Sequence, residues 1–153
     1  MSPGTFSVRR AVTGDAEALA ELYTQLAEDR AVARPARGDD ASELLASILD
    51  NEDRCLLVAT LEGAVVGTAD MVVVGNLTYG GRPWAAVENV VVDQHHRGQG
   101  IGTALVREVI RRATDARCCK VQLMSLKHRK EAHRFYRSLG FQTVAEGFRM
   151  YLD

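Results

Sequence analysis

The segment VVVDQHHRGQGIGT, from Val90 to Thr103, constrains the fold of this chain more than any other part of it. A β-branched apolar run ends at Val92, and apolar residues at helical spacing follow Gly100, which predicts a strand, a turn and a helix in succession. Glycine reaches positive φ and lets other groups approach the backbone, so we expect unusual dihedral angles at Gly98, Gly100 and Gly102. Helix N-termini attract anions. The segment therefore predicts an anion-binding turn that suits a pyrophosphate.

Two other phosphate motifs fit this turn poorly. A P-loop ends in Gly-Lys-Ser/Thr, but glycine and not lysine precedes Thr103. The dinucleotide fingerprint G-x-G-x-x-G needs a glycine where Thr103 stands, and it normally follows a first strand, whereas four candidate strands come before this turn. These departures disfavour nucleotide hydrolysis and nicotinamide binding. A glycine-rich turn without a ligand is the remaining alternative.

Length and composition indicate one globular domain over residues 1–153. A chain of 153 residues with 46% hydrophobic residues buries one sizeable core and is too short for two. The formal net charge of -1 hides a split: residues 1–75 hold 13 Asp+Glu against 6 Arg, and residues 76–153 hold 13 Lys+Arg against 7 Asp+Glu. The basic half favours an anionic ligand.

The sequence indicates a cytoplasmic protein with reduced cysteines. Residues 1–10 contain no apolar signal region, and no stretch approaches the roughly 18 apolar residues of a membrane span. Cys118 and Cys119 are adjacent and Cys55 stands alone, which excludes a disulfide framework and a CxxC motif. The neighbouring His95 and His96 lack a third ligand, so we expect no metal site.

Periodicity and turn residues predict a mixed α/β fold with hairpins and two crossover helices. Asp15 is expected to cap the first helix, and Asp40 with Glu43 to form a capping box for the second, whose apolar stripe includes Leu44. The predicted strands cover residues 6–11, 55–61, 65–74, 85–92 and 120–126, with a final strand or hairpin in 141–152. The predicted helices cover residues 15–29, a stretch from 40, a stretch from 100, and 131–139.

The turn resembles motif A of the GNAT acetyltransferase superfamily, Arg/Gln-x-x-Gly-x-Gly/Ala, through Arg97, Gly100 and Gly102. The segment EAHRFYRSLGF, from Glu131 to Phe141, is similar to a second family motif, Asn-x-x-Ala-x-x-Phe-Tyr-x-x-x-Gly-Phe. The order of predicted elements also suits the family, so the resemblance covers essentially the whole chain. Arg129 departs from the pattern, because many members have asparagine where the last helix opens.

The resemblance implies a GNAT fold: a central, mostly antiparallel sheet flanked by helices, with parallel strands 4 and 5 splayed apart. It also implies acetyl-coenzyme A as co-substrate. Backbone groups at the end of the fourth strand would hold its pantetheine arm, and the turn would hold its pyrophosphate. The expected coenzyme-binding residues are Val90, Val91, Val92, Arg97, Gly98, Gln99, Gly100, Ile101, Gly102, Thr103 and Arg129.

Two residues are candidates for proton transfer. Acetylation needs a neutral amine, and deprotonating an alkylammonium of pKa about 10.4 at neutral pH costs about 4–5 kcal/mol. Glu88 interrupts an apolar strand, so we expect a partly buried carboxylate there that acts as the general base. Asn89 lies on the opposite face from Glu88 in a regular strand, and a bulge would allow the two residues to exchange roles. The resemblance implies that Tyr136 is the general acid for the leaving thiolate; core packing is the alternative.

The acceptor is less constrained. Arg30, Arg34 and Arg37 would suit an anionic group on the acceptor, and a solvated charged loop is the alternative. The region 129–152 is also weakly similar to aminoalkylphosphonate N-acetyltransferases. We therefore predict acetyl transfer by direct attack of a small primary amine in a ternary complex. The alternatives are a peptide or protein acceptor and a non-catalytic acyl-coenzyme A-binding module. We expect a homodimer and no nucleic-acid or membrane partner.

Overall fold

The computed structural model describes residues 4–26 and 34–152. The chain divides into two compact units, Met1–Gln122 and Leu123–Asp153, and each is described by itself. The single domain expected over residues 1–153 stays a prediction. Arg30 lies outside the described residues.

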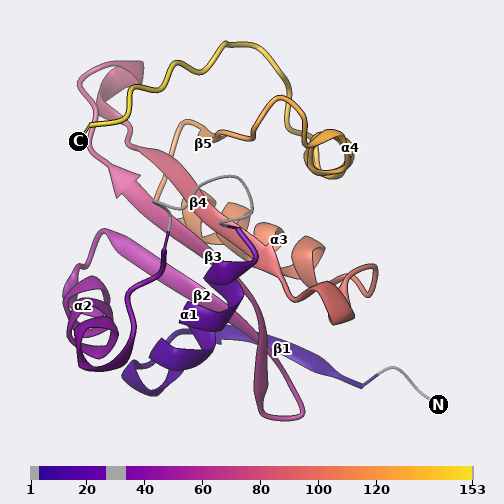
Figure 1. Ribbon diagram of the computed structural model, residues 1–153. Coiled ribbons are helices and arrows are strands. Elements are labelled where there is room, and N and C mark those ends of the chain that lie inside the picture. Colours follow the sequence, from indigo (N-terminus) through magenta and orange to yellow (C-terminus); the bar gives the residue numbers. More distant parts are fainter. Residues whose placement is uncertain (1–3, 27–33, 153) are drawn as a thin grey trace. The chain divides into compact units, whose positions relative to one another are not determined.

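The first unit is built on a five-stranded sheet in the order β1-β2-β3-β4-β5 (Figure 1). Neighbouring strands from β1 to β4 are antiparallel. β5 runs parallel to β4: both strands begin where Cys119 N–H donates to Pro83 O (2.7 Å) and Ala85 N–H donates to Lys120 O (3.0 Å). The mixed, mostly antiparallel sheet is therefore confirmed. The strands are β1 (Phe6–Arg10), β2 (Arg54–Leu61), β3 (Ala64–Val74), β4 (Trp84–Val92) and β5 (Val121–Leu123).

A tight hairpin joins β2 to β3, as the sequence predicts. Glu62 and Gly63 both have positive φ, 50° and 83°. Two consecutive left-handed residues match the right-handed twist of the flanking strands. The resulting register places Leu56 opposite Asp70 and Val58 opposite Thr68.

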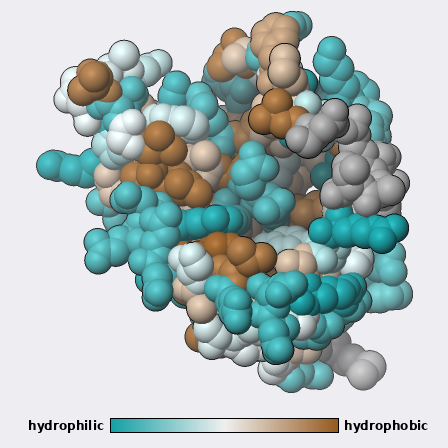
Figure 2. Space-filling view, turned by 60° about the vertical axis from the view of Figure 1, so that its left-hand side comes forward, coloured by the Kyte–Doolittle hydropathy of each residue, from teal (hydrophilic) through white to brown (hydrophobic). Residues whose placement is uncertain are grey.

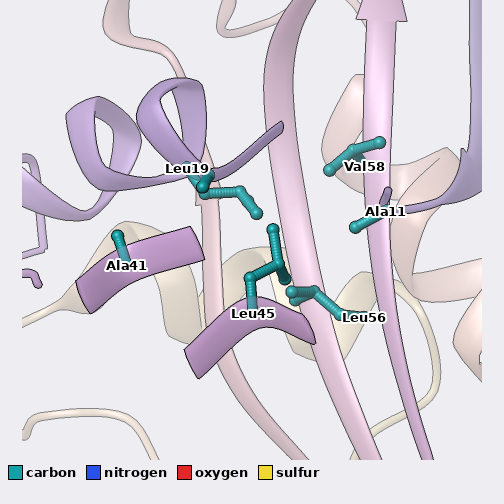
Figure 3. Close-up of a cluster of buried hydrophobic side chains, with 7 residues drawn as sticks. Ala11, Leu19, Ala41, Leu45, Leu56 and Val58 are labelled. Atoms are coloured by element: carbon teal, nitrogen blue, oxygen red, sulfur yellow. The ribbon is translucent and has the colours of Figure 1, made fainter. Parts of the chain in front are cut away.

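Helices cover both faces of this sheet (Figure 1). α1 (Ala16–Thr24) and α2 (Gly38–Asp50) lie on one face, where Leu19 and Leu45 pack against Leu56 and Val58 of β2 (Figure 3). α3 (Ile101–Asp115) lies on the other face, with Leu105 fully buried. Of the described helices, none has the length and apolar composition needed to cross a membrane.

The starts of the first two helices differ from the prediction. Asp15 precedes α1, but its carboxylate accepts hydrogen bonds from Arg9 (2.7 and 2.9 Å) and from Val12 N–H (2.8 Å) instead of capping the helix. α2 begins at Gly38, so the predicted capping box is wrong. Leu44 is 54% exposed, because the face that α2 buries is centred on Leu45.

Large apolar side chains also reach solvent. Figure 2 shows one face on which hydrophobic patches interrupt a mainly hydrophilic surface. Leu77, in the connection between β3 and β4, is fully exposed, and Tyr79 beside it is 61% exposed. The ammonium group of Lys120 lies over the rings of Tyr79 and Trp84, at 5.2 and 6.0 Å from their centroids. Cation–π contacts therefore tie this connection to the start of β5.

The second unit contains α4 (Lys130–Ser138). Gly140 has a φ of 96° just beyond its end, as expected for a glycine that stops a helix. Residues 142–152 form neither helix nor strand, so the predicted final strand is wrong. Phe148 and Met150 follow the alternation of a half-buried strand but are 89% and 84% exposed. The pattern is present without the sheet face that such a strand needs to bury.

Gly67 provides a test of how α3 packs on the sheet. A Cβ there would lie 3.0 Å from Leu105 Cδ1 and 3.1 Å from Ile101 Cγ2. We predict that Gly67→Ala lowers the free energy of unfolding by about 1–2 kcal/mol, since overpacking forces neighbours out of place. Gly75→Ala is the matched control, because nothing lies within 4 Å of its Cβ position. Equal stability of the two variants in urea titrations would contradict this packing.

Candidate active site

β4 carries a bulge between Glu88 and Val91. Glu88 pairs with Asp70 and Val91 pairs with Thr68, so Asn89 and Val90 together oppose one residue of β3. Asn89 has a φ of 53°, a left-handed conformation that asparagine tolerates better than most residues. The bulged alternative considered from the sequence is therefore the one observed. Bulges re-aim side chains and are frequent next to active sites.

The bulge decides which face Glu88 occupies. Directly opposite residues share a face, and side chains alternate along a strand, so Glu88 and Val91 both lie on the face that carries α1 and α2. Val91 is 5% exposed, whereas the Glu88 side chain is open to solvent. The expected partial burial of Glu88 is wrong, because α2 packs on β2 and α1 mainly on β3. Glu88 is thus an exposed residue next to the bulge.

A partly buried ion pair lies next to Glu88 in the sheet. Asp70 is 3% exposed, and the guanidinium of Arg54 binds its carboxylate in bidentate fashion, with Nε donating to Oδ1 at 3.0 Å. Thr68 Oγ1 donates to Leu57 O at 2.7 Å on the same face. Burial raises the pKa of Tyr23, on α1, to about 12, while a hydrogen bond with Thr68 acts in the opposite direction. Polar side chains thus lie on the same face of the sheet as Glu88, the candidate base.

The turn after β4 is held by its own first residue. Asp93 Oδ1 accepts hydrogen bonds from His95 N–H (2.8 Å) and from the His96 ring Nδ1 (3.1 Å). Partial burial alone would raise the pKa of Asp93, but these hydrogen bonds and one from Gln25 outweigh it and hold that pKa below its usual value. The Arg97 side chain folds back, and its Nε donates to Val92 O at 3.2 Å.

The glycines that precede α3 leave its N-terminus uncovered by side chains. Gly98 and Gly100 have φ of 76° and 83°, and a Cβ at either position would meet nothing within 4 Å. Gly102 is a helical residue, so its predicted unusual dihedral angle is wrong. Ala104 N–H donates to Gly100 O at 3.0 Å as the first intrahelical bond, which leaves the preceding N–H groups for a ligand.

This N-terminus fits an anion by its surroundings as well. α3 has no side-chain cap and no acidic residue in its first turn. The sequence-predicted residues Gly98, Gln99 and Gly100 are exposed, and Gly102 and Thr103 are half-buried. Ile101 is 1% exposed and anchors the helix in the core. A pyrophosphate would satisfy N–H groups that have no partner in the helix.

In the second unit, Tyr136 lies between two aromatic rings. The ring centroids of Phe135 and Phe141 are 5.1 and 5.7 Å from that of Tyr136. Burial raises the pKa of the Tyr136 hydroxyl, and the charge of Arg129 acts in the opposite direction. Arg129 is exposed at the start of α4. Tyr136 is therefore a protonated, partly enclosed phenol at neutral pH.

The arginines expected to bind the acceptor do not behave alike. Arg34 is exposed. Arg37 instead donates to Glu21 (2.6 Å) and Glu17 (3.1 Å) of α1. Its charge is engaged within the protein, which leaves Arg34 as the better candidate of the two. Within the described residues, no group of three or more His, Cys, Asp or Glu is placed to hold a metal ion.

Sequence reasoning missed the polar partners around the site. A lone aspartate inside the apolar run of β3 was the available signal for Asp70, because carboxylates are rarely buried without a partner. Nothing in the local sequence marks Arg54 as that partner. Gln25 gave no signal at all, and its contacts become visible only in the folded chain.

Comparison with known proteins gives a consistent result. The profile of the "Acetyltransferase (GNAT) family" matches residues 17–141. A glucosamine 6-phosphate N-acetyltransferase of Trypanosoma brucei brucei is 33% identical over 111 residues, which are 69% of this chain and 74% of that protein. The N-acetyltransferase 8B of Homo sapiens is 35% identical over 109 residues, 71% of this chain, and the match spans about half of it, 48%.

Solved structures agree with this match. A putative acetyltransferase from Agrobacterium tumefaciens str. C58 is 36% identical, with a TM-score of 0.88, and the alignment covers 95% of this chain and 99% of that one. The glucosamine-6-phosphate N-acetyltransferase of Arabidopsis thaliana, 22% identical with a TM-score of 0.84, shares the fold. The chain therefore belongs to the GNAT family of acetyltransferases and is an acyltransferase of the N-acetyltransferase class.

Proposed function

We propose that this chain transfers the acetyl group of acetyl-coenzyme A to the primary amine of a small molecule, by direct attack in a ternary complex. The observation that carries the proposal is the open turn at Gly98 and Gly100, which presents the unpaired N–H groups of α3 directly after the bulged β4. Family membership supports the coenzyme. The name of the trypanosome relative supports a small amine as acceptor.

The residues of the turn and of β4 would hold the coenzyme. Backbone groups of Val90, Val91 and Val92 would pair with the pantetheine arm. The N–H groups from Gly98 to Thr103, including those of Gln99, Ile101 and Gly102, would hold the pyrophosphate. Arg97 contributes first through its backbone, since its side chain is bonded to Val92 O. Arg129 is the proposed coenzyme contact in the second unit.

Proton transfer would be divided between two side chains. The coenzyme supplies a thioester acyl group. Glu88, beside the bulge and open to solvent, would accept the proton that the acceptor ammonium must lose. Asn89 would orient the acceptor from the bulge itself. Tyr136, whose pKa is raised by burial, would donate a proton to the departing thiolate. The expected cytoplasmic location and homodimer stay predictions.

An amine panel tests the acceptor class. We predict that thiol release from acetyl-coenzyme A is faster with an amino sugar phosphate or an aminoalkylphosphonate than with the matching neutral amine, by about tenfold in kcat/KM, because a cation–anion hydrogen bond contributes roughly 1.5–3 kcal/mol. Arg34→Ala should remove that preference and leave the neutral amine unchanged. Arg37→Ala is the control, because Glu17 and Glu21 hold that side chain.

Other outcomes of the panel would overturn the proposal. Faster turnover of peptide N-termini or lysines would indicate a protein acetyltransferase. Saturable coenzyme binding with no turnover of any amine would indicate a non-catalytic binding module.

Gly100 tests the coenzyme turn. We predict that Gly100→Ala weakens coenzyme A binding at least tenfold, because an alanine at a φ of 83° is strained by about 1–2 kcal/mol and its Cβ enters the open space before α3. Gly80→Ala is the matched control: its φ of 69° imposes similar strain away from the turn. Isothermal titration calorimetry measures both. Equal affinities would contradict the assignment of the turn.

Tyr136 and Glu88 test the proton transfers. We predict that Tyr136→Phe and Glu88→Gln each lower kcat by about 10²–10⁴ while the Kd for coenzyme A stays unchanged. Tyr79→Phe and Glu62→Gln, at exposed positions, are controls and should retain wild-type rates. The pKa of Tyr136 is raised from 10.0, so the alkaline fall in kcat should lie above pH 10. An unchanged kcat in Tyr136→Phe would exclude Tyr136 as the acid.

A further inference from the structure

Gln25 joins α1 to the turn that follows β4. It caps the C-terminus of α1, with its N–H donating to Leu22 O at 3.0 Å. Its side-chain amide reaches across 68 residues of sequence, and Nε2 donates to Asp93 Oδ2 at 3.1 Å. The other amide atom, Oε1, accepts the Gln94 N–H at 3.0 Å. One side chain thus donates to the turn and accepts from it at two successive residues.

These two bonds hold the turn at its start, where the chain leaves β4. Asp93 is the last residue before the short helical turn Gln94–His96, and its own carboxylate already binds the His95 N–H and the His96 ring. Of the described residues outside 88–103, Gln25 supplies the side chain that bonds to this turn. Without it, Asp93 keeps its bonds within the turn and its N–H bond to Val66 O (2.9 Å), but the Gln94 N–H loses its partner and the turn loses its side-chain link to α1.

We propose that Gln25 is a positioning residue for coenzyme binding, which orients the turn so that the N–H groups from Gly98 to Thr103 converge on the pyrophosphate. The inference rests on the proposed function, because it takes this turn as the coenzyme site. Gln25 touches neither substrate in this account. It acts through Asp93 and Gln94, and a two-point amide fixes both the position and the rotation of the peptide that follows.

A glutamate at this position separates positioning from general stability. Gln25→Glu keeps the shape and the acceptor for Gln94 N–H, but its carboxylate cannot donate and repels Asp93. The protonated acid restores one O–H donor and one acceptor, which is what the amide offers. The nearby carboxylate raises the pKa of the new acid, so low pH should repair the variant. The titratable groups around this point are Asp15, Glu21, Asp93, His95 and His96.

The experiment measures coenzyme A affinity by calorimetry from pH 5 to pH 8, with each variant expressed relative to wild type at the same pH. This ratio cancels the titration of the coenzyme phosphate, and Gln25→Ala controls for the titration of His95 and His96. We expect Gln25→Ala to weaken binding about tenfold at every pH. Gln25→Glu should be at least as weak at pH 8 and return to within about threefold of wild type at pH 5. Hydrogen exchange at Gln94 N–H should quicken in parallel.

Thr24→Ala is the matched control. Thr24 is the neighbouring residue at the same helix end, but its hydroxyl donates to Glu21 O at 2.6 Å within α1. It should bind coenzyme A as wild type does. If the wild type binds coenzyme A and both Gln25 variants bind it with the same affinity as the wild type, this inference is overturned and the proposed function stands. A loss in Gln25→Glu that low pH does not repair would reduce Gln25 to a merely structural role. Failure of the wild type to bind coenzyme A would overturn the proposed function.

Discussion

The architecture depends on how β4 ends. A central strand buried among its neighbours must pass within eight residues, Asp93–Gly100, to a helix that packs on the sheet face opposite α1 and α2. Backbone N–H groups at that junction cannot all be paired, because a helix leaves its first donors without partners. The chain meets this constraint with two left-handed glycines and no cap, so the unsatisfied donors lie in the open. The proposed coenzyme site therefore lies where the fold itself leaves backbone donors without partners.

Charge contributes less directly than the sequence suggests. The basic excess of residues 76–153 coincides with the segment expected to hold an anionic coenzyme. Arg111 and Arg112, however, bind Glu108 at 2.7 Å, and Arg111 also binds Asp115 at 2.8 Å. The hydrogen bond from Arg111 is the main cause that lowers the pKa of Glu108 to about 2. These cations lie about 15 Å along α3 from its N-terminus, so they add little at the turn, where the oriented backbone dipoles and Arg97 supply the positive charge.

Acidic residues of the first half of the sequence show the same internal pairing. The acidic half of the sequence contributes Glu17 and Glu21 to an exposed pair with Arg37, and it contributes Asp70 to a buried pair with Arg54. Asp70 lies opposite Glu88 in the ladder, so two carboxylates share one row of the sheet. Arg54 compensates the buried one. Removing Arg54 would leave a buried carboxylate without a compensating charge, which costs more than the pair itself contributes.

Much of the fold was predictable because its signals are local. The Glu62-Gly63 hairpin, the helix opening after Gly100 and the stop at Gly140 each need a backbone conformation that adjacent residues encode. Where a signal was local but ambiguous, prediction failed. Asp15 had the spacing of a cap, yet Arg9 and Val12 take its carboxylate. The alternating residues near Phe148 have the pattern of a strand, and a pattern alone supplies no partner.

The sequence by itself determined the strand, turn and helix between Val90 and Thr103 and the aromatic helix around Tyr136, since glycine dihedrals and helical spacing are properties of neighbouring residues. Only the tertiary structure decided that Asn89 takes the bulge, that Glu88 faces solvent, that Arg54 neutralises Asp70 and that Gln25 reaches Asp93. Each of these depends on strand register or on how a helix packs on the sheet. Register is set by the packing of the whole sheet, which no single stretch of sequence contains.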